Sequence, residues 1–286
     1  MKHKNTLTVL AVLASILAIF ATIIGIFTKG GPGTYSYESI RGQMVPIYGK
    51  GIYQHMSADV AIQGIAQDFV TLFVAMPLLL FALVYARKGS LRARFVLAGT
   101  FFYFLVTFLF YTTMGMYNSL FLVYVALLGL SFFGLSITLL SFDVQQLPEV
   151  FVSEAPARFV GGFLIFNVIA IALLWLGVIV PPLLDGTIYP AVVQHYTTLI
   201  VQGLDLGLLL PIGFVAGWLL LRKRPLGYLM GTTYIIFLAI LMTALTAKLI
   251  AMGLAGVNII PAVFIIPAFN LIAIAGAFAI LRKIKN

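Results

Sequence analysis

Eight long apolar segments run through the chain and constrain its fold more than any other feature. They lie near Thr6–Phe27, Phe69–Ala86, Phe95–Gly115, Leu120–Phe142, Phe159–Val180, Thr198–Leu221, Tyr228–Ala251 and Val257–Leu281. An α-helix needs about 20 apolar residues to cross the hydrocarbon of a bilayer. Spanning segments must be helices or closed barrel strands, and barrel strands would alternate apolar with polar residues. The sequence therefore predicts an all-α, polytopic integral membrane helix bundle of about eight transmembrane helices.

Composition excludes several classes of protein. Apolar residues make up 62% of the chain and charged residues 9%, whereas soluble proteins are about half apolar and a quarter charged. The sequence has no cysteine, which excludes disulfides, thiolate catalysis and iron–sulfur ligation. It contains no P-loop, G-x-S-x-G, H-E-x-x-H or dinucleotide-binding pattern. The net charge of +9 lies in short clusters beside apolar segments, so we expect no nucleic-acid binding.

The basic residues predict the orientation in the membrane, because Lys and Arg collect in cytoplasmic loops. With the N-terminus inside, the inner side holds Lys2, Lys4, Arg87, Lys88, Arg92, Arg94, Arg158, Arg222, Lys223, Arg224, Arg282, Lys283 and Lys285. The outer side holds Lys29, Arg41, Lys50 and Lys248. Both termini are therefore expected in the cytoplasm of a multi-pass plasma-membrane protein. The first apolar segment is longer than the h-region of a signal peptide, typically 7–15 residues, which favours a retained helix over a cleaved one.

Two polar segments lie outside the predicted spans of this single transmembrane domain, residues 1–286. The outer loop, residues 28–67, is rich in Gly and Tyr. The inner loop, residues 143–158, carries Asp143, Glu149 and Glu154 and is the one acidic inner loop, so it is a candidate docking surface for a protein partner. Both segments are too short to form independent domains.

The two halves of the chain, residues 1–142 and 143–286, resemble each other in a common alignment frame. Ile65 matches Ile200 and Gln67 matches Gln202, while Pro77 and Pro211 fall one residue apart in this frame. Four spans per unit would give two repeats of the same orientation, related by an axis along the membrane normal. The alternative is that any two helices that enter from outside and end in a basic loop look alike.

Polar residues are expected to line one face of the second and sixth helices where these rise above the membrane. The second helix would begin at Ser57 as its N-cap, and the sixth would have Pro190 in its first turn. The two stripes are Asp59, Gln63 and Gln67, and His195, Thr198, Gln202 and Asp205. Their helical spacing places each stripe on one face, so the sequence predicts a polar vestibule that faces outward.

The candidate residues for contact with a substrate or ion are Gln67, Asp68, His195, Gln202 and Asp205. Counting back from the basic inner loops places both carboxylates near the outer boundary of the hydrocarbon. The alternative interpretation is therefore an interfacial carboxylate that the helix N-terminus favours. His55 and His195 lack the close spacing of a metal site, so we expect no metal and no cofactor.

Prolines and glycines within the spans have structural and functional interpretations. Pro77 and Pro211 are candidate hinges, because interrupted helices at matching positions often flank a transporter's binding site; plain kinks are the alternative. Three G-x-x-x-G pairs are expected to allow close helix packing. They are Gly203/Gly207, Gly213/Gly217 and Gly227/Gly231.

Three functions remain open from the sequence. The first is a transporter or permease-like protein for a small solute or ion, with Gln202, Asp205, Gln67 and Asp68 as contacts. The second is a non-catalytic sensor, assembly factor or subunit of a complex, which the apparent lack of a deeply placed charge favours. A membrane-embedded enzyme acting on lipid or quinone is the least supported, since only His195, Asp205 and the outer tyrosines could contribute.

Overall fold

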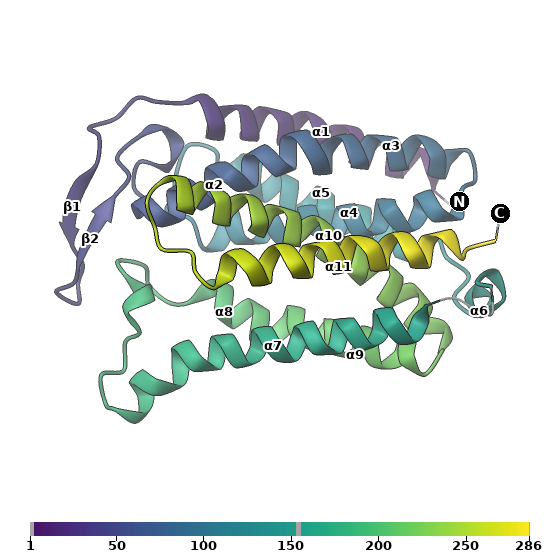
Figure 1. Cartoon of the computed structure of the whole chain (residues 1–286). Helices are drawn as coiled ribbons and strands as arrows, with labels where there is room; N and C mark the ends of the chain where they lie inside the picture. Colours follow the sequence, from purple (N-terminus) through teal and green to yellow (C-terminus); the bar gives the residue numbers. More distant parts are fainter. Residues whose placement is uncertain (1–2, 153–155, 286) are drawn as a thin grey trace.

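The computed structural model describes residues 3–152 and 156–285 and shows a bundle of long helices with a small β-hairpin at one end (Figure 1). In these residues, eight helices are long and apolar enough to cross a membrane, which confirms the predicted all-α bundle and indicates a multi-pass membrane protein. They are α1 (Lys4–Phe27), α2–η2–α3 (Ala58–Arg87), α4 (Leu91–Thr113), α5 (Phe121–Leu140), α7 (Ala157–Leu184), α8–η4–α9 (Ile200–Leu221), α10 (Pro225–Leu254) and α11 (Ala262–Arg282).

Shorter elements occupy the two ends of the bundle. The hairpin pairs β1 (Tyr35–Glu38) with β2 (Met44–Ile47) in antiparallel register, and the one-turn helix η1 (Gly51–Tyr53) follows it. A second one-turn helix, η3 (Ala191–Val193), lies in the loop before α8, and α6 (Leu147–Val150) lies in the loop before α7. Two residues named in the sequence predictions lie outside the described residues. They are Lys2, one of the basic residues that predict the orientation, and Glu154, one of the acidic residues of the predicted inner loop.

The predicted start of the sixth helix is wrong. Pro190 does not open this helix, which begins at Ile200 after the single turn of η3. Ile188 and Gln194 have φ of 67° and 51°, and such left-handed backbone interrupts a helix. Contacts with the first half of the chain hold this loop, so tertiary structure overrides its local pattern.

The start of the last helix also differs from the prediction. Gly256, with φ of 84°, follows the end of α10, and α11 begins at Ala262 rather than Val257. Pro261 stands at the N-cap of α11 instead of within the span, where its missing N–H removes no helical hydrogen bond.

Helices α4 and α10 pack along each other and join the two halves of the bundle. Within each half, the first span contacts the second and fourth, and the third contacts the second and fourth. At the junction the rings of Phe102 and Phe237 stack with centroids 4.2 Å apart and planes inclined by 21°. Gly99 allows this approach, since a Cβ there would collide with Ile236. The contact between the halves therefore includes the third span of each, and α10 also packs along α2.

Two of the three glycine pairs pack as predicted. Gly213 lies against Tyr234 of α10, and Gly217 lies against Gly161 of α7. Gly227 and Gly231 lie against the end of α9. Gly203 and Gly207 differ, because a Cβ at either would meet no atom within 4 Å.

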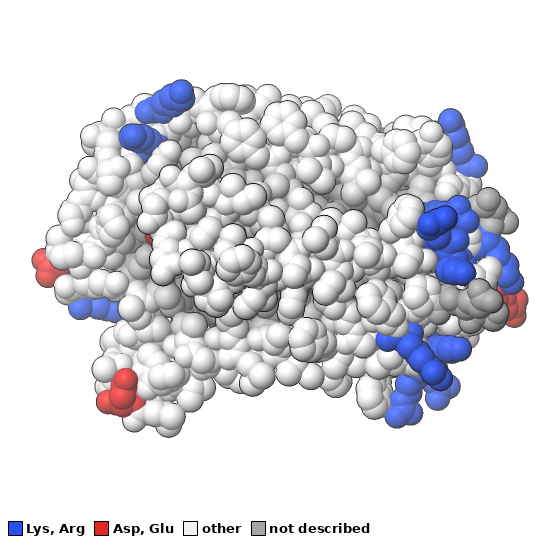
Figure 2. Space-filling view, in the orientation of Figure 1, with Lys and Arg blue, Asp and Glu red and all other residues white. Residues whose placement is uncertain are grey.

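Charged side chains gather at the ends of the bundle. Figure 2 shows Lys and Arg clustered at the end that holds both termini, and a wide belt without charge between the two ends. At the basic end, the residues after α11 bond to the residues after α6: the Val152 amide donates to Lys283 O at 2.9 Å and the Lys285 amide donates to Val150 O at 2.9 Å. Asp143 and Glu149 remain exposed there.

Candidate binding cavity between the two halves

A cavity of about 420 Å³ lies between the halves, lined by α2, α4, α7, α8, η4, α10 and the loop before α8. It exists because the packing between the halves is uneven: α10 packs along α2, whereas α4 touches α8 at few positions. Its size falls within the range of about 300–1,000 Å³ typical of small-molecule sites.

The cavity reaches from the hairpin end of the bundle to near its middle. Asp59, Gln194 and Tyr196 line it at the hairpin end, and Tyr234 and Phe237 line its deepest part. Tyr234 is nine residues from the start of α10 at the basic end, or about 13 Å along a helix. Half the thickness of a bilayer core is about 15 Å, so the cavity ends near mid-span.

Gln67 lies on the cavity wall and is only 3% exposed. Its Nε2 donates to the Tyr103 hydroxyl at 2.8 Å and to the Thr107 hydroxyl at 3.0 Å. Its Oε1 is buried without a partner among the described residues. The two hydrogen bonds thus fix the amide in one orientation and leave its oxygen unpaired in the described residues.

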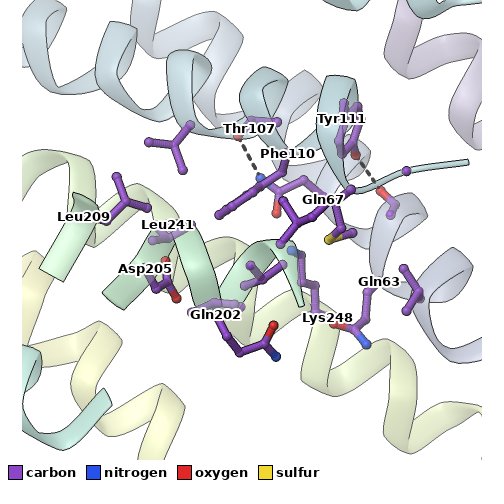
Figure 3. A pocket seen from close by; sticks show the side chains of 18 of the residues that line it. Gln63, Gln67, Thr107, Phe110, Tyr111, Gln202, Asp205, Leu209, Leu241 and Lys248 are labelled. Atoms are coloured by element: carbon purple, nitrogen blue, oxygen red, sulfur yellow. Dashed lines mark hydrogen bonds between the residues drawn. The ribbon is translucent and has the colours of Figure 1, made fainter. Parts of the chain in front are cut away.

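Gln202 and Asp205 lie on the facing wall, so the structure brings three of the predicted residues to one cavity (Figure 3). Asp205 Oδ2 accepts a hydrogen bond from the indole Nε1 of Trp175 at 2.8 Å. Asp205 is also the first residue of η4 (Asp205–Leu209), a π-helical segment. Such single-turn insertions occur frequently at functional sites.

Asp68 follows Gln67 in sequence but does not line the cavity. Its carboxylate is 2% exposed and lies between two tyrosines, 2.5 Å from the Tyr53 hydroxyl and 2.9 Å from the Tyr111 hydroxyl. A Cβ at Gly25 of α1 would collide with this carboxylate. Tyr53 lies outside the spans, and burial raises the pKa of its hydroxyl. The negative charge of the Asp68 carboxylate raises this pKa further. Tyr53 therefore stays a protonated donor to Asp68.

Lys248 also lines the cavity and is a charged residue that sequence reasoning missed. It interacts electrostatically with Asp68 and Asp205, and its ammonium group makes no hydrogen bond within residues 3–152 and 156–285. The sequence placed it on the outer side, and in the structure it lies within α10, six residues before Leu254. The sequence held the signal: Lys248 is the one charge inside the predicted span Tyr228–Ala251, and an intramembrane charge is a functional candidate.

His195 stands apart from the other predicted residues. It is not part of the cavity lining or of α8, and its Nε2 lies 3.0 Å from the carbonyl of His55. Its ring packs against Tyr37 and Tyr196. In the described residues, no group of three or more His, Asp and Glu side chains lies together in a way that could hold a metal ion.

The candidate hinges share one local structure. Pro77 and Pro211 are each the second residue of a helix, α3 (Met76–Arg87) and α9 (Leu210–Leu221). Each helix follows a five-residue π-helical segment, η2 (Thr71–Ala75) or η4. When the first residues of the two π segments are matched, Pro77 falls on Pro211. The wider backbone of a π turn fits a position where proline removes a hydrogen bond.

The outer loop of the first half is fastened to the loop that precedes α8. From the tip of the hairpin, the Arg41 guanidinium donates to the carbonyls of Gln194, Tyr196 and Thr197 at 3.4, 2.9 and 3.2 Å. Asp59 accepts from Gln194 Nε2 at 3.2 Å. Since Gln194 and Tyr196 line the cavity, these bonds set the position of its wall at the hairpin end.

Comparisons of the chain with protein-family models, with curated proteins and with solved structures gave no match.

Proposed function

We propose that the chain is a permease-like protein that takes a small solute from the outer side of a membrane into the cavity between its halves. The observation that carries the proposal is the convergence of Gln67, Gln202, Asp205 and Lys248 on one cavity inside the spanning region. Polar and charged side chains are costly at this depth and are generally retained there for a solute or ion pathway.

The proposal includes an internal duplication with an axis along the membrane normal. Phe102 and Phe237 match each other in the frame that pairs Gln67 with Gln202, and their rings stack, as equivalent residues do on a two-fold axis. The matched π segments and prolines, and the like contacts inside each half, support the same relationship. In transporters, sites lie at the interface between such repeats, which is where this cavity lies.

The proposal also includes the orientation, with both termini in the cytoplasm of a plasma-membrane protein. Basic side chains crowd the end of the bundle that holds the termini (Figure 2), as in cytoplasmic ends of membrane proteins. The cavity then faces outward. Movement of α3 and α9 about their π segments would open it on the other side.

The absence of cysteine makes the access route directly testable. Gln202→Cys in the cavity wall and Leu210→Cys near its floor are treated with a membrane-impermeant thiol reagent in intact cells and in inverted vesicles. We expect Gln202→Cys to react from outside and Leu210→Cys to react from both sides, because a permease alternates its access. Reaction of neither residue from outside would refute an outward-facing cavity.

Uptake is measured without assuming the solute. Proteoliposomes are incubated with a defined mixture of amino acids, sugars, carboxylates and amines, and their contents are analysed by mass spectrometry. We expect accumulation of at least one solute with the unaltered protein and little with the double variant Asp205→Asn, Lys248→Met. Outside access without any accumulation would refute transport.

The second candidate function is a sensor or subunit that binds a solute and reports it to a partner. The observation that favours it is the exposure of Asp143 and Glu149 at the basic end of the bundle. Stoichiometric co-purification of a partner that Asp143→Lys, Glu149→Lys removes, together with no uptake, would support this candidate. The enzyme hypothesis has no such support, because His195 is not part of the cavity lining that contains Asp205.

A further inference from the structure

Two side chains of opposite charge face the cavity without pairing with each other. Lys248 interacts electrostatically with Asp68 and with Asp205, but within the described residues the one hydrogen bond to the Asp205 carboxylate comes from Trp175. Lys248 has three N–H donors and uses none of them in the described structure, and Asp205 keeps one oxygen free. Charges left unpaired in an apolar surrounding are costly, so the arrangement suits a ligand that supplies both counter-charges.

Both charges lie near the ends of their helices that face the hairpin. Lys248 is six residues from the outer end of α10 and Asp205 is five residues from the start of α8, which correspond to about 9 Å and 8 Å along the helices. Gln67 and Asn167 add neutral polar groups, each 3% exposed or less, with Oε1 of Gln67 and Nδ2 of Asn167 unpartnered in the described residues. All four line the same cavity.

The remaining wall is mostly apolar. It is lined by Val106, Phe110, Leu238, Leu241, Met242 and Leu245. In Figure 3, Phe110 is drawn on the side of Gln67 and Leu241 on the side of Asp205. Along α10, the floor at Phe237 is eleven residues from Lys248, or about 16 Å. A ligand anchored at Lys248 and Asp205 therefore has room for an apolar body toward the middle of the membrane.

We infer that the cavity binds a small amphipathic zwitterion, with its anionic oxygens on Lys248, its ammonium group on Asp205 and its apolar body against Phe110 and Leu241. This inference rests on the proposed function and names its class of solute. A simple anion would pair with Lys248 and leave Asp205 without a counter-charge, and a simple cation would do the converse. A zwitterion pairs with both and adds no net charge to the site, which limits the electrostatic cost of burial.

The test uses the full chain in nanodiscs made only of phosphatidylglycerol, so that no zwitterionic lipid competes. Binding is measured for L-leucine, for 4-methylpentanoate, which lacks its ammonium group, and for 3-methylbutylamine, which lacks its carboxylate. We expect L-leucine to bind at least about tenfold more tightly than either analogue, which corresponds to about 1.4 kcal/mol. Dihexanoylphosphatidylcholine is the fourth probe and distinguishes a lipid headgroup from a free zwitterion.

Two variants give a crossed pattern that loss of folding cannot imitate. Lys248→Met should weaken binding of L-leucine and 4-methylpentanoate at least about tenfold and leave 3-methylbutylamine unchanged. Asp205→Asn should weaken L-leucine and 3-methylbutylamine and leave 4-methylpentanoate unchanged. Lys50→Met, at an exposed lysine outside the cavity, is the matched control and should change none of them.

Each outcome decides the inference. Binding of L-leucine, or of dihexanoylphosphatidylcholine alone, with the crossed pattern supports a zwitterion site and identifies its source. Equal binding of an analogue and L-leucine, or no saturable binding of either zwitterion, overturns it. Thiol access and uptake of another class of solute do not depend on these probes, so the proposed function can stand when this inference fails.

Discussion

Phe102 of α4 and Phe237 of α10 stack on each other at the junction of the two halves, although they lie far apart in the sequence. Both rings are almost fully buried. Offset-stacked aromatic pairs contribute about 0.5–1.5 kcal/mol beyond their burial. The pair thus fastens together the helices that form one side of the cavity.

Replacement of either ring should destabilise the bundle to a similar extent. We expect Phe102→Ala and Phe237→Ala each to lower the unfolding temperature in detergent, and the double variant to lose less than the sum by about 0.5–1.5 kcal/mol, because one stacking contact is removed in either case. Phe278→Ala, at a ring that is 61% exposed, is the control and should have little effect. Strictly additive losses would contradict the coupling.

Substitution of Gly25 should disturb the buried carboxylate of Asp68. A Cβ on this α1 residue would collide with the carboxylate and lie close to the Tyr53 hydroxyl, so Gly25→Ala should destabilise the protein by about 1–3 kcal/mol, as overpacking does. Gly177→Ala is the control, since a Cβ there meets no atom within 4 Å. It should be neutral or stabilising, because alanine favours helix over glycine by about 1 kcal/mol. Equal effects in thermal unfolding would refute the crowding.

The Tyr53 hydroxyl should make stability sensitive to alkaline pH. Burial raises the pKa of Tyr53 well above its ordinary value, and the Asp68 carboxylate raises it further. A pKa raised in the folded state means that stability is full below the unfolded value of about 10 and falls as the pH rises toward the folded value. Between about pH 10 and 12, Tyr53→Phe should therefore lose stability less steeply than the unaltered protein.

The same variant should be less stable at neutral pH, because the hydrogen bond to Asp68 is lost. Tyr117→Phe, at a ring that is 78% exposed, should behave like the unaltered protein at both pH values. Parallel pH profiles for all three proteins would show that Tyr53 does not carry the effect.

The hydrogen bonds between Arg41 and the loop before α8 should control access to the cavity. Arg41→Ala removes three hydrogen bonds to the loop before α8, so the outer wall should open more often. We expect Gln202→Cys to react with an external thiol reagent about tenfold faster in this background, equivalent to about 1.4 kcal/mol. Lys50→Ala, at an exposed residue of the same segment before α2, is the control and should leave the rate unchanged. An unchanged rate with Arg41→Ala would show that these hydrogen bonds do not limit access.

Single cysteines should map the orientation of the chain. The chain has no native cysteine, so single cysteines can be introduced at exposed lysines. The three variants are Lys50→Cys, Lys88→Cys and Lys223→Cys. In intact cells, the impermeant thiol reagent should label Lys50→Cys but not Lys88→Cys or Lys223→Cys. The latter two should be labelled only after the membrane is permeabilised. Labelling of Lys88→Cys and Lys223→Cys from opposite sides would contradict the proposed topology.

The sequence by itself determined the eight apolar helices and most of their ends, because a bilayer admits few solutions for such segments. It also predicted that Gln67, Gln202 and Asp205 belong together, from helical spacing and the alignment of the two halves. Pro77 and Pro211 were visible as a matched pair, although the π segments before them were not, since no residue pattern specifies a π turn.

Only the tertiary structure decided which polar groups meet. Asp68 and Gln67 are adjacent in sequence, yet neighbouring positions on a helix point to different sides, so one faces two tyrosines and the other the cavity. Lys248 joins the site from α10, well beyond Asp205 in the sequence, and the loop before α8 is shaped by Arg41 of the hairpin. These relationships depend on how the two halves pack, and the packing energy is spread over contacts that are distant in sequence.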